Sequence, residues 1–552
     1  MNEGNALLKS STSSRQVEQL DEIVIGKDVL ELVSSAMYVD PLTIFREYVQ
    51  NAADAIDEAR TAGLYAKGES GLIEIGIDTA QRKVTIRDNG TGVPWKDFGR
   101  RLTALGASAK RGGTARGFRG VGRLAGLGYA QKLVFRSRTE QDDLVSELSW
   151  DCRLLRSSLR SAETNGGLED LIRQVATLSR VAPDGYPDRF FEVELDGVVR
   201  FRSDTLMSPK AIGEYLAQVA PVPFAPDFEF TASISEAVEP AVKLDTLELK
   251  ISGLEEPVYR PHRKGFSDEK RTGRFEDIEV FTIPDVDGEP AAVGWILHHE
   301  YDGAIPVGTG FKGLRLRVGN VQIGGNALLE ELFTESRFNS WSIGEVHILD
   351  RRVVPNARRD DFEQNAHYSN LLNQLAPIAR AISKRCRTSS KQRQLLRDFQ
   401  LQEQGIKERL QILQQGGIRR EARKVQTAQI DSSLQKMDRL ANSHDLEAEK
   451  ERLVGRISKL RQRVQDTAVA SASSPLELLP PHKRAMYGQM IDLIYDCSVN
   501  RIAAKSLVDR ILEKIVEEKS AAAKLPKKQN GFKKASATRA KPRNSGRKSR
   551  LR

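Results

Sequence analysis

The stretch EYVQNAADAIDEA, residues 47–59, decides the fold, because it has the pattern of an amphipathic helix with two different faces. Glu47, Asn51 and Asp54 are four and three residues apart, so their side chains form one polar stripe along a helix. The opposite arc predicts a face packed on a core, and it consists of Phe45, Tyr48, Val49, Ala52 and Ile56. A polar stripe of this kind is usually a solvent-exposed face, so its meaning depends on the rest of the chain.

Length and composition predict a soluble protein of several domains. The 552 residues are too many for one core, and 39% hydrophobic with 29% charged residues is typical of globular domains with highly charged segments. No run approaches the roughly 18 apolar residues of a membrane span, and the N-terminus lacks the apolar core of a signal peptide. We therefore expect no membrane association and an intracellular, cytoplasmic protein, with a nuclear or nucleoid location left open. The three cysteines are isolated and no HExxH occurs, which excludes the common zinc motifs.

The net charge of +10 comes from the end of the chain. Residues 524–552 contain twelve Lys or Arg and no acid, so the rest of the chain is close to neutral. Such a tail predicts salt-dependent, sequence-independent binding to double-stranded DNA, or else it serves solubility or targeting. Both alternatives stay open.

Periodicity and composition divide the chain into segments of different character. Helical periodicity followed by alternating apolar and polar residues predicts helices on a mostly antiparallel sheet, an α+β sandwich. A second mixed α/β domain follows it, and then an a/d seam predicts a coiled coil that is broken near residues 416–417. The seam residues are Phe399, Ile406, Leu410, Leu413, Leu453, Ile457, Leu460 and Val464. The expected segments are a flexible N-terminus (1–21), a first domain (22–205), a middle domain (206–387), a coiled coil (388–470), a linker (471–481), a helical segment (482–518) and a disordered basic tail (519–552).

Two further motifs combine glycine with charge. DNGTG, residues 88–92, follows an apolar strand, and it is either a plain turn or a place where a ligand approaches the backbone beside Asp88. Eight glycines lie between Gly106 and Gly128, and their backbone N–H groups, with nearby cations, predict phosphate binding. There is no GxxxxGK[ST], which excludes a P-loop. No strand precedes Gly120 and Gly122, which excludes a dinucleotide-binding fingerprint.

These motifs together resemble a known family of ATPases. IGKDVLELVSSAMYVDPLTIFREYVQNAADAIDEAR, TIRDNGTGV, LTALGASAKRGG and GFRGVGRLAGLG occur in this order within residues 22–140. In this they resemble the ATPase domain of the ninety-kilodalton heat-shock chaperones, and more broadly the gyrase, chaperone, histidine kinase and mismatch-repair (GHKL) superfamily. The resemblance implies a Bergerat-type ATP-binding α/β sandwich in residues 22–205, with ATP and Mg²⁺ as cofactors.

The resemblance also implies a role for each matching residue. Glu47 is expected to be the general base that activates water, Asn51 the Mg²⁺ ligand and Asp54 part of the nucleotide pocket. Asp88 is expected to read the adenine amino group, with Gly92 letting the base approach. The phosphate loop and its lid are expected to contain Lys110, Gly117, Phe118, Arg119, Gly120, Val121 and Gly122. Related enzymes support the adenine-binding Asp with a Thr on a later strand, and DRFFEVELDG, residues 188–197, offers none.

The middle domain carries a weaker resemblance. GLRLRVGNVQIG (313–324) followed by VVPNARRDDFE (353–363) resembles the catalytic loop of the chaperone middle domain. This implies that Arg359, or alternatively Arg358, reaches the γ-phosphate, where a guanidinium stabilises developing charge. A surface ion pair with Asp360 or Asp361 is the other interpretation. Beyond about residue 385 the chain does not resemble the chaperone's dimerisation domain.

The leading functional hypothesis is a slow, Mg-dependent ATPase that drives a dimeric clamp acting on a protein client or on DNA. The alternative is a nucleotide-gated scaffold or nucleic-acid-binding protein that hydrolyses little ATP. Histidine kinase activity is disfavoured, because no phospho-acceptor His lies on a helical hairpin before the ATPase motifs.

Overall fold

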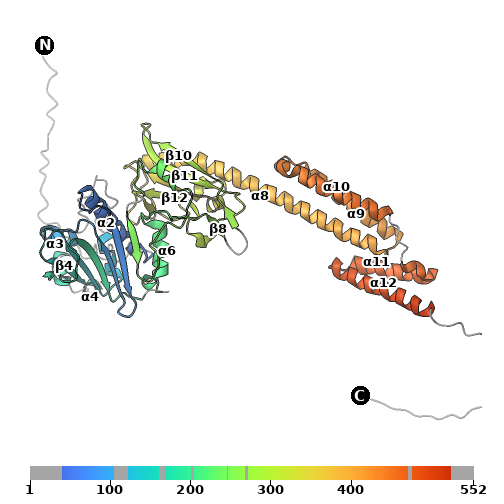
Figure 1. The fold of residues 1–552 in the computed structure, drawn as a ribbon, viewed down its shortest axis with the longest axis horizontal. Coiled ribbons are helices and arrows are strands. Elements are labelled where there is room, and N and C mark those ends of the chain that lie inside the picture. Colours follow the sequence, from blue (N-terminus) through green and yellow to red (C-terminus); the bar gives the residue numbers. More distant parts are fainter. Residues whose placement is uncertain are drawn as a thin grey trace, which may run out of the picture. The chain divides into compact units, whose positions relative to one another are not determined.

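The computed structural model describes residues 40–104, 122–160, 168–200, 204–244, 247–267, 272–469 and 475–523. The chain divides into two compact units, Met1–Ser390 and Lys391–Arg552 (Figure 1). The first unit contains the β-sheets with their covering helices, and the described part of the second is helical. The predicted mixed α+β architecture is therefore confirmed for the sheet-rich first unit.

Seven strands form the first sheet, in the order β5-β4-β3-β6-β2-β1-β7. Neighbouring strands are antiparallel, except for the parallel pair β1 and β7. The strands are β1 (Leu72–Asp78), β2 (Lys83–Asp88), β3 (Lys132–Arg138), β4 (Val145–Asp151), β5 (Ala176–Val181), β6 (Phe190–Asp196) and β7 (Glu248–Ile251). Because β2 lies between β6 and β1, the DNGTG segment leaves the sheet from an inner strand.

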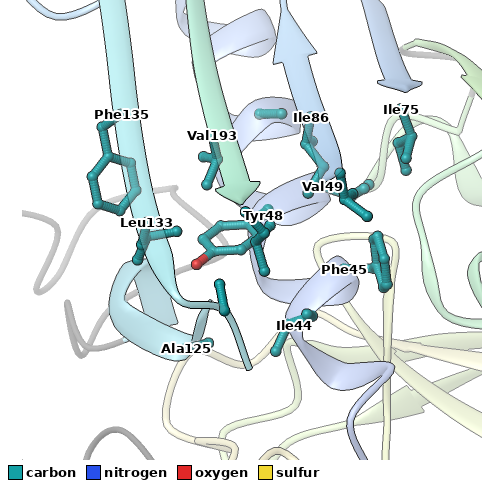
Figure 2. Close-up of a cluster of buried hydrophobic side chains, with 14 of the residues drawn as sticks. Ile44, Phe45, Tyr48, Val49, Ile75, Ile86, Ala125, Leu133, Phe135 and Val193 are labelled. Atoms are coloured by element: carbon teal, nitrogen blue, oxygen red, sulfur yellow. The ribbon is translucent and has the colours of Figure 1, made fainter. Parts of the chain in front are cut away.

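Helices pack against this sheet and enclose the first core. They are α2 (Thr43–Thr61), α3 (Trp95–Thr103), the 3₁₀ helix η2 (Gly122–Gly128), α4 (Cys152–Arg160), α5 (Leu168–Val175), η3 (Thr205–Met207) and α6 (Pro209–Val219). Phe45 and Val49 of α2 lie among Ile75, Ile86 and Val193 of the sheet (Figure 2). Each fully buried side chain of this size contributes roughly 1.5–3 kcal/mol, so the apolar arc fixes α2 on the sheet.

A second sheet has the strand order β10-β11-β14-β12-β13. Its strands are β10 (Asp277–Pro284), β11 (Pro290–His298), β12 (Gly313–Val318), β13 (Val321–Ile323) and β14 (Ile343–Ile348), and β8 (Gly265–Ser267) pairs with β9 (Thr272–Arg274) as a separate hairpin. Strands β12 and β14 are parallel, and the other neighbours are antiparallel. The short helices of this part are α7 (Thr231–Val238), η4 (Val307–Thr309), η5 (Glu330–Leu332) and η6 (Ser336–Trp341). Two cores lie against this sheet, one with the start of α8 and the other with α7.

The chain crosses twice between the two sheets. Helix α6 belongs to the first core, α7 belongs to a core of the second sheet, and β7 then returns to pair with β1. The chain therefore passes from one sheet to the other after α6 and returns before β7, within one unit.

The second unit is built from helices that fold back on one another. They are α8 (Ala366–Gln415), which begins in the first unit, α9 (Arg420–Ala441), η7 (His444–Glu449), α10 (Lys450–Val469), η8 (Pro475–Leu478), α11 (Pro481–Cys497) and α12 (Arg501–Ala523). Helix α8 ends just before Gly416, whose φ of +73° is the left-handed conformation that often terminates helices. The chain therefore turns back at Gly416 and does not continue as one long helix.

The predicted coiled coil is not confirmed. Its seam residues on α8 and α10 are buried in one core together with α9, so they pack within a single chain. They are Phe399, Ile406, Leu410, Leu413, Leu453, Ile457 and Leu460, with Val464 partly buried beside them. A second, smaller core joins α11, α12 and η8. Residues 22–39, which begin the first motif, and the basic tail at 524–552 lie outside the described residues.

Candidate functional site

The polar stripe of α2 is buried. Glu47 and Asp54 are only 5% and 3% exposed, and Asn51 is half-buried. The interpretation of this stripe as a solvent-exposed face is therefore wrong, because two carboxyl side chains do not lose their hydration at a plain helix surface.

Tyr48 holds the end of the glycine-rich stretch against α2. Its hydroxyl donates to the carbonyl of Arg123 at 3.1 Å and accepts from the backbone N–H of Gly126 at 2.8 Å. A Cβ on Gly122 would lie 2.3 Å from Oε2 of Glu47, so any other residue at this position would displace the Glu47 carboxylate. Gly122 thus lies beside Glu47, while Lys110, Gly117, Phe118, Arg119, Gly120 and Val121 lie outside the described residues.

The DNGTG segment is joined to the same helix. The N–H of Thr91 donates to the carbonyl of Ala55 on α2 at 3.3 Å, and a Cβ on Gly90 would lie 2.6 Å from the Cβ of Ala55. Gly92 has a φ of +66°, which favours glycine. Asp88 and the polar stripe of α2 are therefore held together by backbone contacts that need small residues.

Asp88 is a buried acid whose carboxylate has few stabilising hydrogen bonds. Its Oδ1 accepts a hydrogen bond from the N–H of Gly90 at 2.9 Å, and its side chain is almost fully removed from solvent. Burial raises the pKa of Asp88 to about 7, and the Gly90 N–H and the charge of Arg189 oppose this only in part. A group that donates a hydrogen bond to this carboxylate would relieve that cost.

Sequence reasoning missed two residues that support this segment. Arg189 donates to the carbonyls of Asn89 and Gly90 at 2.9 and 3.0 Å. The Ser137 hydroxyl accepts from the N–H of Val93 at 2.8 Å and donates to the carbonyl of Phe190 at 3.0 Å. Neither residue belongs to a motif, so spacing offered no signal for them.

Arg359 comes to α2 from the part of the chain that follows the second sheet. Its Nε lies 3.5 Å from Oε1 of Glu47, and Arg46 contacts the same oxygen at 3.2 Å. Arg46 also donates to the carbonyl of Arg358 at 3.1 Å, so the main chain of this loop is bonded to α2 as well. The geometry brings Arg359, rather than the Arg358 side chain, to Glu47.

Hydrogen bonds within the loop that contains Arg359 fix the position of its main chain. Arg359 has a φ of +57°, and its carbonyl accepts from the N–H of Gly324 at 2.9 Å. Asp360 accepts from the Asn356 amide at 2.6 Å, and Asp361 accepts from the Tyr368 hydroxyl at 3.2 Å. Both acids thus have other partners, and the ion pair described for Arg359 is the one with Glu47.

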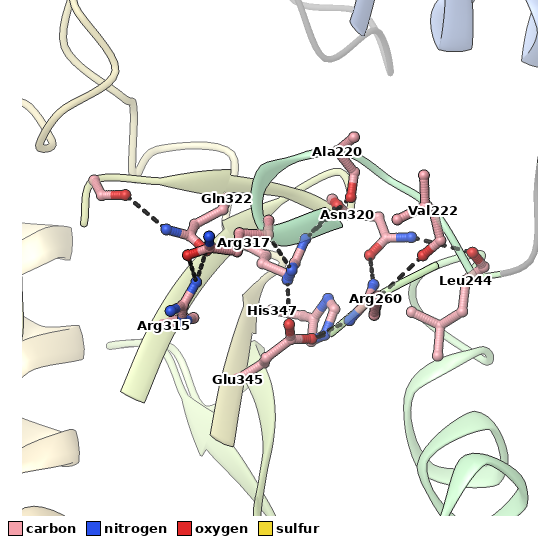
Figure 3. A network of polar contacts seen from close by, with 12 residues as sticks. Ala220, Val222, Leu244, Arg260, Arg315, Arg317, Asn320, Gln322, Glu345 and His347 are labelled. Atoms are coloured by element: carbon pink, nitrogen blue, oxygen red, sulfur yellow. Dashed lines mark hydrogen bonds and ion pairs between the residues drawn. The ribbon is translucent and has the colours of Figure 1, made fainter. Parts of the chain in front are cut away.

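A buried polar network fixes the end of α6 to the second sheet (Figure 3). Arg317 donates to the carbonyl of Gln218 at 2.7 Å, and Arg260 donates to that of Val222 at 3.1 Å. Both guanidiniums pair with Glu345, which is fully buried. Burial alone would raise the pKa of Glu345, but the two guanidiniums hold it well below its usual range. Because α6 packs in the first core, this network links the second sheet to the layer that contains α2.

Neither a preformed metal cluster nor a membrane helix occurs in the described part of the chain. Among these residues, no three His, Cys, Asp or Glu side chains gather as metal ligands. Mg²⁺ commonly takes one or two protein ligands and completes its shell with phosphate oxygens and water, and the amide of Asn51 fits that role. Of the helices described, none is long and apolar enough to cross a membrane.

The mixed sheet, a helix with buried Glu and Asp beside Asn, and the end of a glycine-rich segment (Gly122–Gly128) are the features that the resemblance to GHKL-type ATPase domains leads one to expect. Residues 42–163 match the family model of histidine kinase-, DNA gyrase B-, and HSP90-like ATPases, which confirms the resemblance seen in the motifs.

The chain is also similar to bacterial chaperones over short stretches. It is 30% identical to chaperone protein HtpG of Polaromonas naphthalenivorans (strain CJ2) over 127 residues, 20% of this chain and 20% of that protein. It is 37% identical to HtpG of Gluconobacter oxydans (strain 621H) over 108 residues, 18% of this chain and 17% of the relative. With HtpG of Mycobacterium tuberculosis (strain ATCC 25618 / H37Rv) it shares 35% identity over 101 residues, 17% and 15% of the two chains. The matches thus span a fifth or less of each relative.

Proposed function

We propose that this protein binds Mg·ATP at α2 and β2, hydrolyses it slowly, and uses the cycle to drive a conformational clamp. The observation that carries the proposal is the buried Glu47 carboxylate, which lies between the backbone of Gly122 and the guanidinium of Arg359. An acid can orient and deprotonate a water molecule only if it is held in place, and the ion pairs of Oε1 with Arg359 and Arg46, at 3.5 and 3.2 Å, orient the Glu47 carboxylate.

Each polar group at the site then has a defined task. Glu47 is the general base, and Arg359 is near enough to stabilise negative charge on a phosphoryl group beside Glu47. Asn51 offers an amide oxygen to Mg²⁺, which would neutralise charge on the phosphates. Asp54 lines the nucleotide pocket one turn further along α2.

The adenine end of the pocket is assigned to Asp88 and Gly92. The Asp88 carboxylate would accept a hydrogen bond from the adenine amino group, and Gly92 leaves room for the base. For the phosphates we propose Lys110, Gly117, Phe118, Arg119, Gly120, Val121 and Gly122, on the motif resemblance alone.

We favour a protein client as the molecule on which the clamp acts. The relatives are named chaperones, although the chain matches only a fifth or less of their length. Double-stranded DNA is the second candidate, supported by the twelve cations of residues 524–552. A homodimer fits either version, because a clamp needs two ATPase domains.

Steady-state hydrolysis tests the proposal. Glu47→Ala should retain ATP binding and lose most turnover, while Glu58→Ala, an exposed acid on the same helix, should behave as the unchanged protein. Equal turnover in the two variants would remove Glu47 from the role of base. Tight ATP binding with negligible turnover in the unchanged protein would favour the alternative, a nucleotide-gated scaffold.

The same hydrolysis assay distinguishes a clamp that acts on a protein client from one that acts on DNA. Adding double-stranded DNA should leave turnover unchanged if the client is a protein, and raise it if DNA is the substrate. Deleting residues 524–552 should abolish salt-dependent retention of DNA without altering basal hydrolysis, and retention that survives the deletion would exclude the tail as the binding element.

A further inference from the structure

Gln322 on β13 connects the buried polar network to the loop that contains Arg359. Its Oε1 accepts a hydrogen bond from Nη1 of Arg315 at 2.8 Å (Figure 3), and its Nε2 donates to the carbonyl of Gly324 at 2.9 Å. The N–H of Gly324 in turn donates to the carbonyl of Arg359 at 2.9 Å. Three successive hydrogen bonds thus lead from the interior of the second sheet to the residue that pairs with Glu47.

The orientation of the Gln322 amide is fixed by the chemistry of its two partners. A guanidinium can only donate hydrogen bonds and a carbonyl oxygen can only accept them, so the amide oxygen must face Arg315 and the amide nitrogen must face Gly324. Gln322 is only 4% exposed, so both bonds are shielded from bulk water. An amide satisfies both partners because it offers an acceptor on one side and a donor on the other.

Gly324 is held on both sides of its Cα. Its carbonyl is bonded to Gln322 and its N–H to Arg359, so these two hydrogen bonds restrain both of its backbone torsion angles. Its φ of +69° favours glycine, which has the least intrinsic restraint of any residue. A Cβ on Gly324 would lie 2.9 Å from the carbonyl oxygen of Asp360, so the Arg359 loop (residues 353–363) packs directly on this backbone. The conformation of Gly324 therefore fixes where the main chain of the loop lies.

We propose that Gln322 is a positioning residue for Arg359, which acts by holding Gly324 in the conformation that brings the Arg359 guanidinium to Glu47. This inference rests on the proposed function, because it assigns Arg359 to the transferring phosphoryl group. A guanidinium stabilises the developing charge only at the right distance and angle, and the main chain of Arg359 is anchored here by the Gly324 N–H. Loss of the Gln322 donor should therefore impair hydrolysis without removing any group proposed to bind ATP.

Gln322→Glu separates positioning from packing. The carboxylate has nearly the same shape and still accepts from Arg315, but when ionised it has no donor for the carbonyl of Gly324. Among the described residues no carboxylate forms an ion pair with Arg315, and Glu345 opposite it on β14 pairs with two other arginines. Burial and the charge of Arg317 lower the pKa of Arg315 to about 10, so a carboxylate beside it is favourable. The variant should therefore keep the core of the second sheet folded.

Gln218→Glu is the matched control. Gln218, on α6, also accepts from Nη1 of Arg315, at 3.2 Å, but its Nε2 donates to a carbonyl one turn earlier in the same helix. The control therefore places a carboxylate against the same guanidinium and leaves the bond between Gln322 and Gly324 intact. Its kcat should stay close to that of the unchanged protein, since its side chain has no bond to the Arg359 loop.

Steady-state hydrolysis by the full-length chain measures the effect on Arg359. Gln322→Glu should lower kcat about 10- to 100-fold with KM for ATP little changed, because a displaced guanidinium loses contact with the transition state but not with bound ATP. In combination with Arg359→Ala it should cause no further loss, because the two residues act as one unit. An unchanged kcat, losses that add up, or equal losses in Gln322→Glu and Gln218→Glu would overturn the proposal.

Hydrogen exchange of the nucleotide-free chain tests the same contact without catalysis. Gln322→Glu should speed exchange at the N–H of Gly324 and in peptides covering residues 353–363, whereas Gln218→Glu should not, and mass spectrometry measures both. Unchanged exchange in this loop would overturn the proposal even if the chain hydrolyses ATP. If the unchanged chain does not turn over ATP, the proposed function fails, while faster exchange in Gln322→Glu alone would still assign Gln322 to the positioning of this loop.

Discussion

Replacing Asp88 with Asn should stabilise the nucleotide-free protein at neutral pH while it removes the carboxylate proposed to bind adenine. The two side chains have nearly the same shape, so the packing around α2 and β2 is kept. What changes is the charge: burial raises the pKa of Asp88 to about 7, so the native protein keeps this acid protonated until neutral pH.

The size of the effect follows from the difference between the folded and unfolded pKa values. The ordinary pKa is 3.8 and the folded value is about 7. Because the folded pKa is the higher one, the stability contributed by protonated Asp88 is fully present below the ordinary pKa and is lost as pH rises through the folded value. Between pH 5 and 7 the unchanged protein should lose about 2 kcal/mol relative to Asp88→Asn, at about 1.4 kcal/mol per pH unit. Above pH 7 the difference should level off.

Hydrogen exchange of the β2 amides, read by mass spectrometry, measures this stability locally in the full chain. The comparison runs from pH 5 to 8, with intrinsic exchange rates corrected for pH, and Asp184→Asn on an exposed loop serves as control. Parallel profiles for the Asp88→Asn variant and the unchanged protein would refute the reasoning, because they would mean that Asp88 ionises as a solvated acid. Loss of ATP binding by the same variant, measured by calorimetry, tests its proposed role separately.

Three other substitutions test the surroundings of Glu47. Gly122→Ala should lower kcat about 10²-fold, because its Cβ displaces the Glu47 carboxylate, and a kcat within twofold would contradict that contact. Arg359→Ala should lower kcat by roughly 10³-fold with ATP affinity little changed, and an equal loss of affinity would indicate a binding role instead. Tyr48→Phe should cost about 1–2 kcal/mol in urea unfolding, since the N–H of Gly126 loses its acceptor, and unchanged stability would mean that water replaces the hydroxyl.

The sequence predicted the stripe on α2 but not what covers it. Helical spacing is a local property, so Glu47, Asn51 and Asp54 could be aligned from their positions alone. Burial of the stripe depends on residues far away in the sequence. Arg46, for example, donates a hydrogen bond to the carbonyl of Arg358, 312 positions further along the chain. The resemblance to a family drew attention to Arg359 in this distant loop, which periodicity could not do, and its role at the γ-phosphate stays a prediction.

In the C-terminal helices, periodicity predicted an apolar face but not its partner. An a/d pattern shows only that one face of a helix is apolar, and such a face can pack against a partner chain or against another helix of the same chain. Here α8 ends before Gly416 and the chain turns back, so Leu410 and Ile457 share a core without a second copy.

The adenine end of the site shows how a missing motif residue changes the chemistry. The Thr that the family resemblance leads one to expect is absent: Phe191 of β6 stands opposite Asp88, and Ser137 stands opposite Phe191 on the next strand. The Ser137 hydroxyl supports the main chain at Val93 instead of the carboxylate. With the Gly90 N–H as its hydrogen-bond donor, the buried acid keeps a raised pKa. Its need for a further donor is what an adenine amino group would meet, so the departure from the family pattern makes recognition depend more strongly on Asp88.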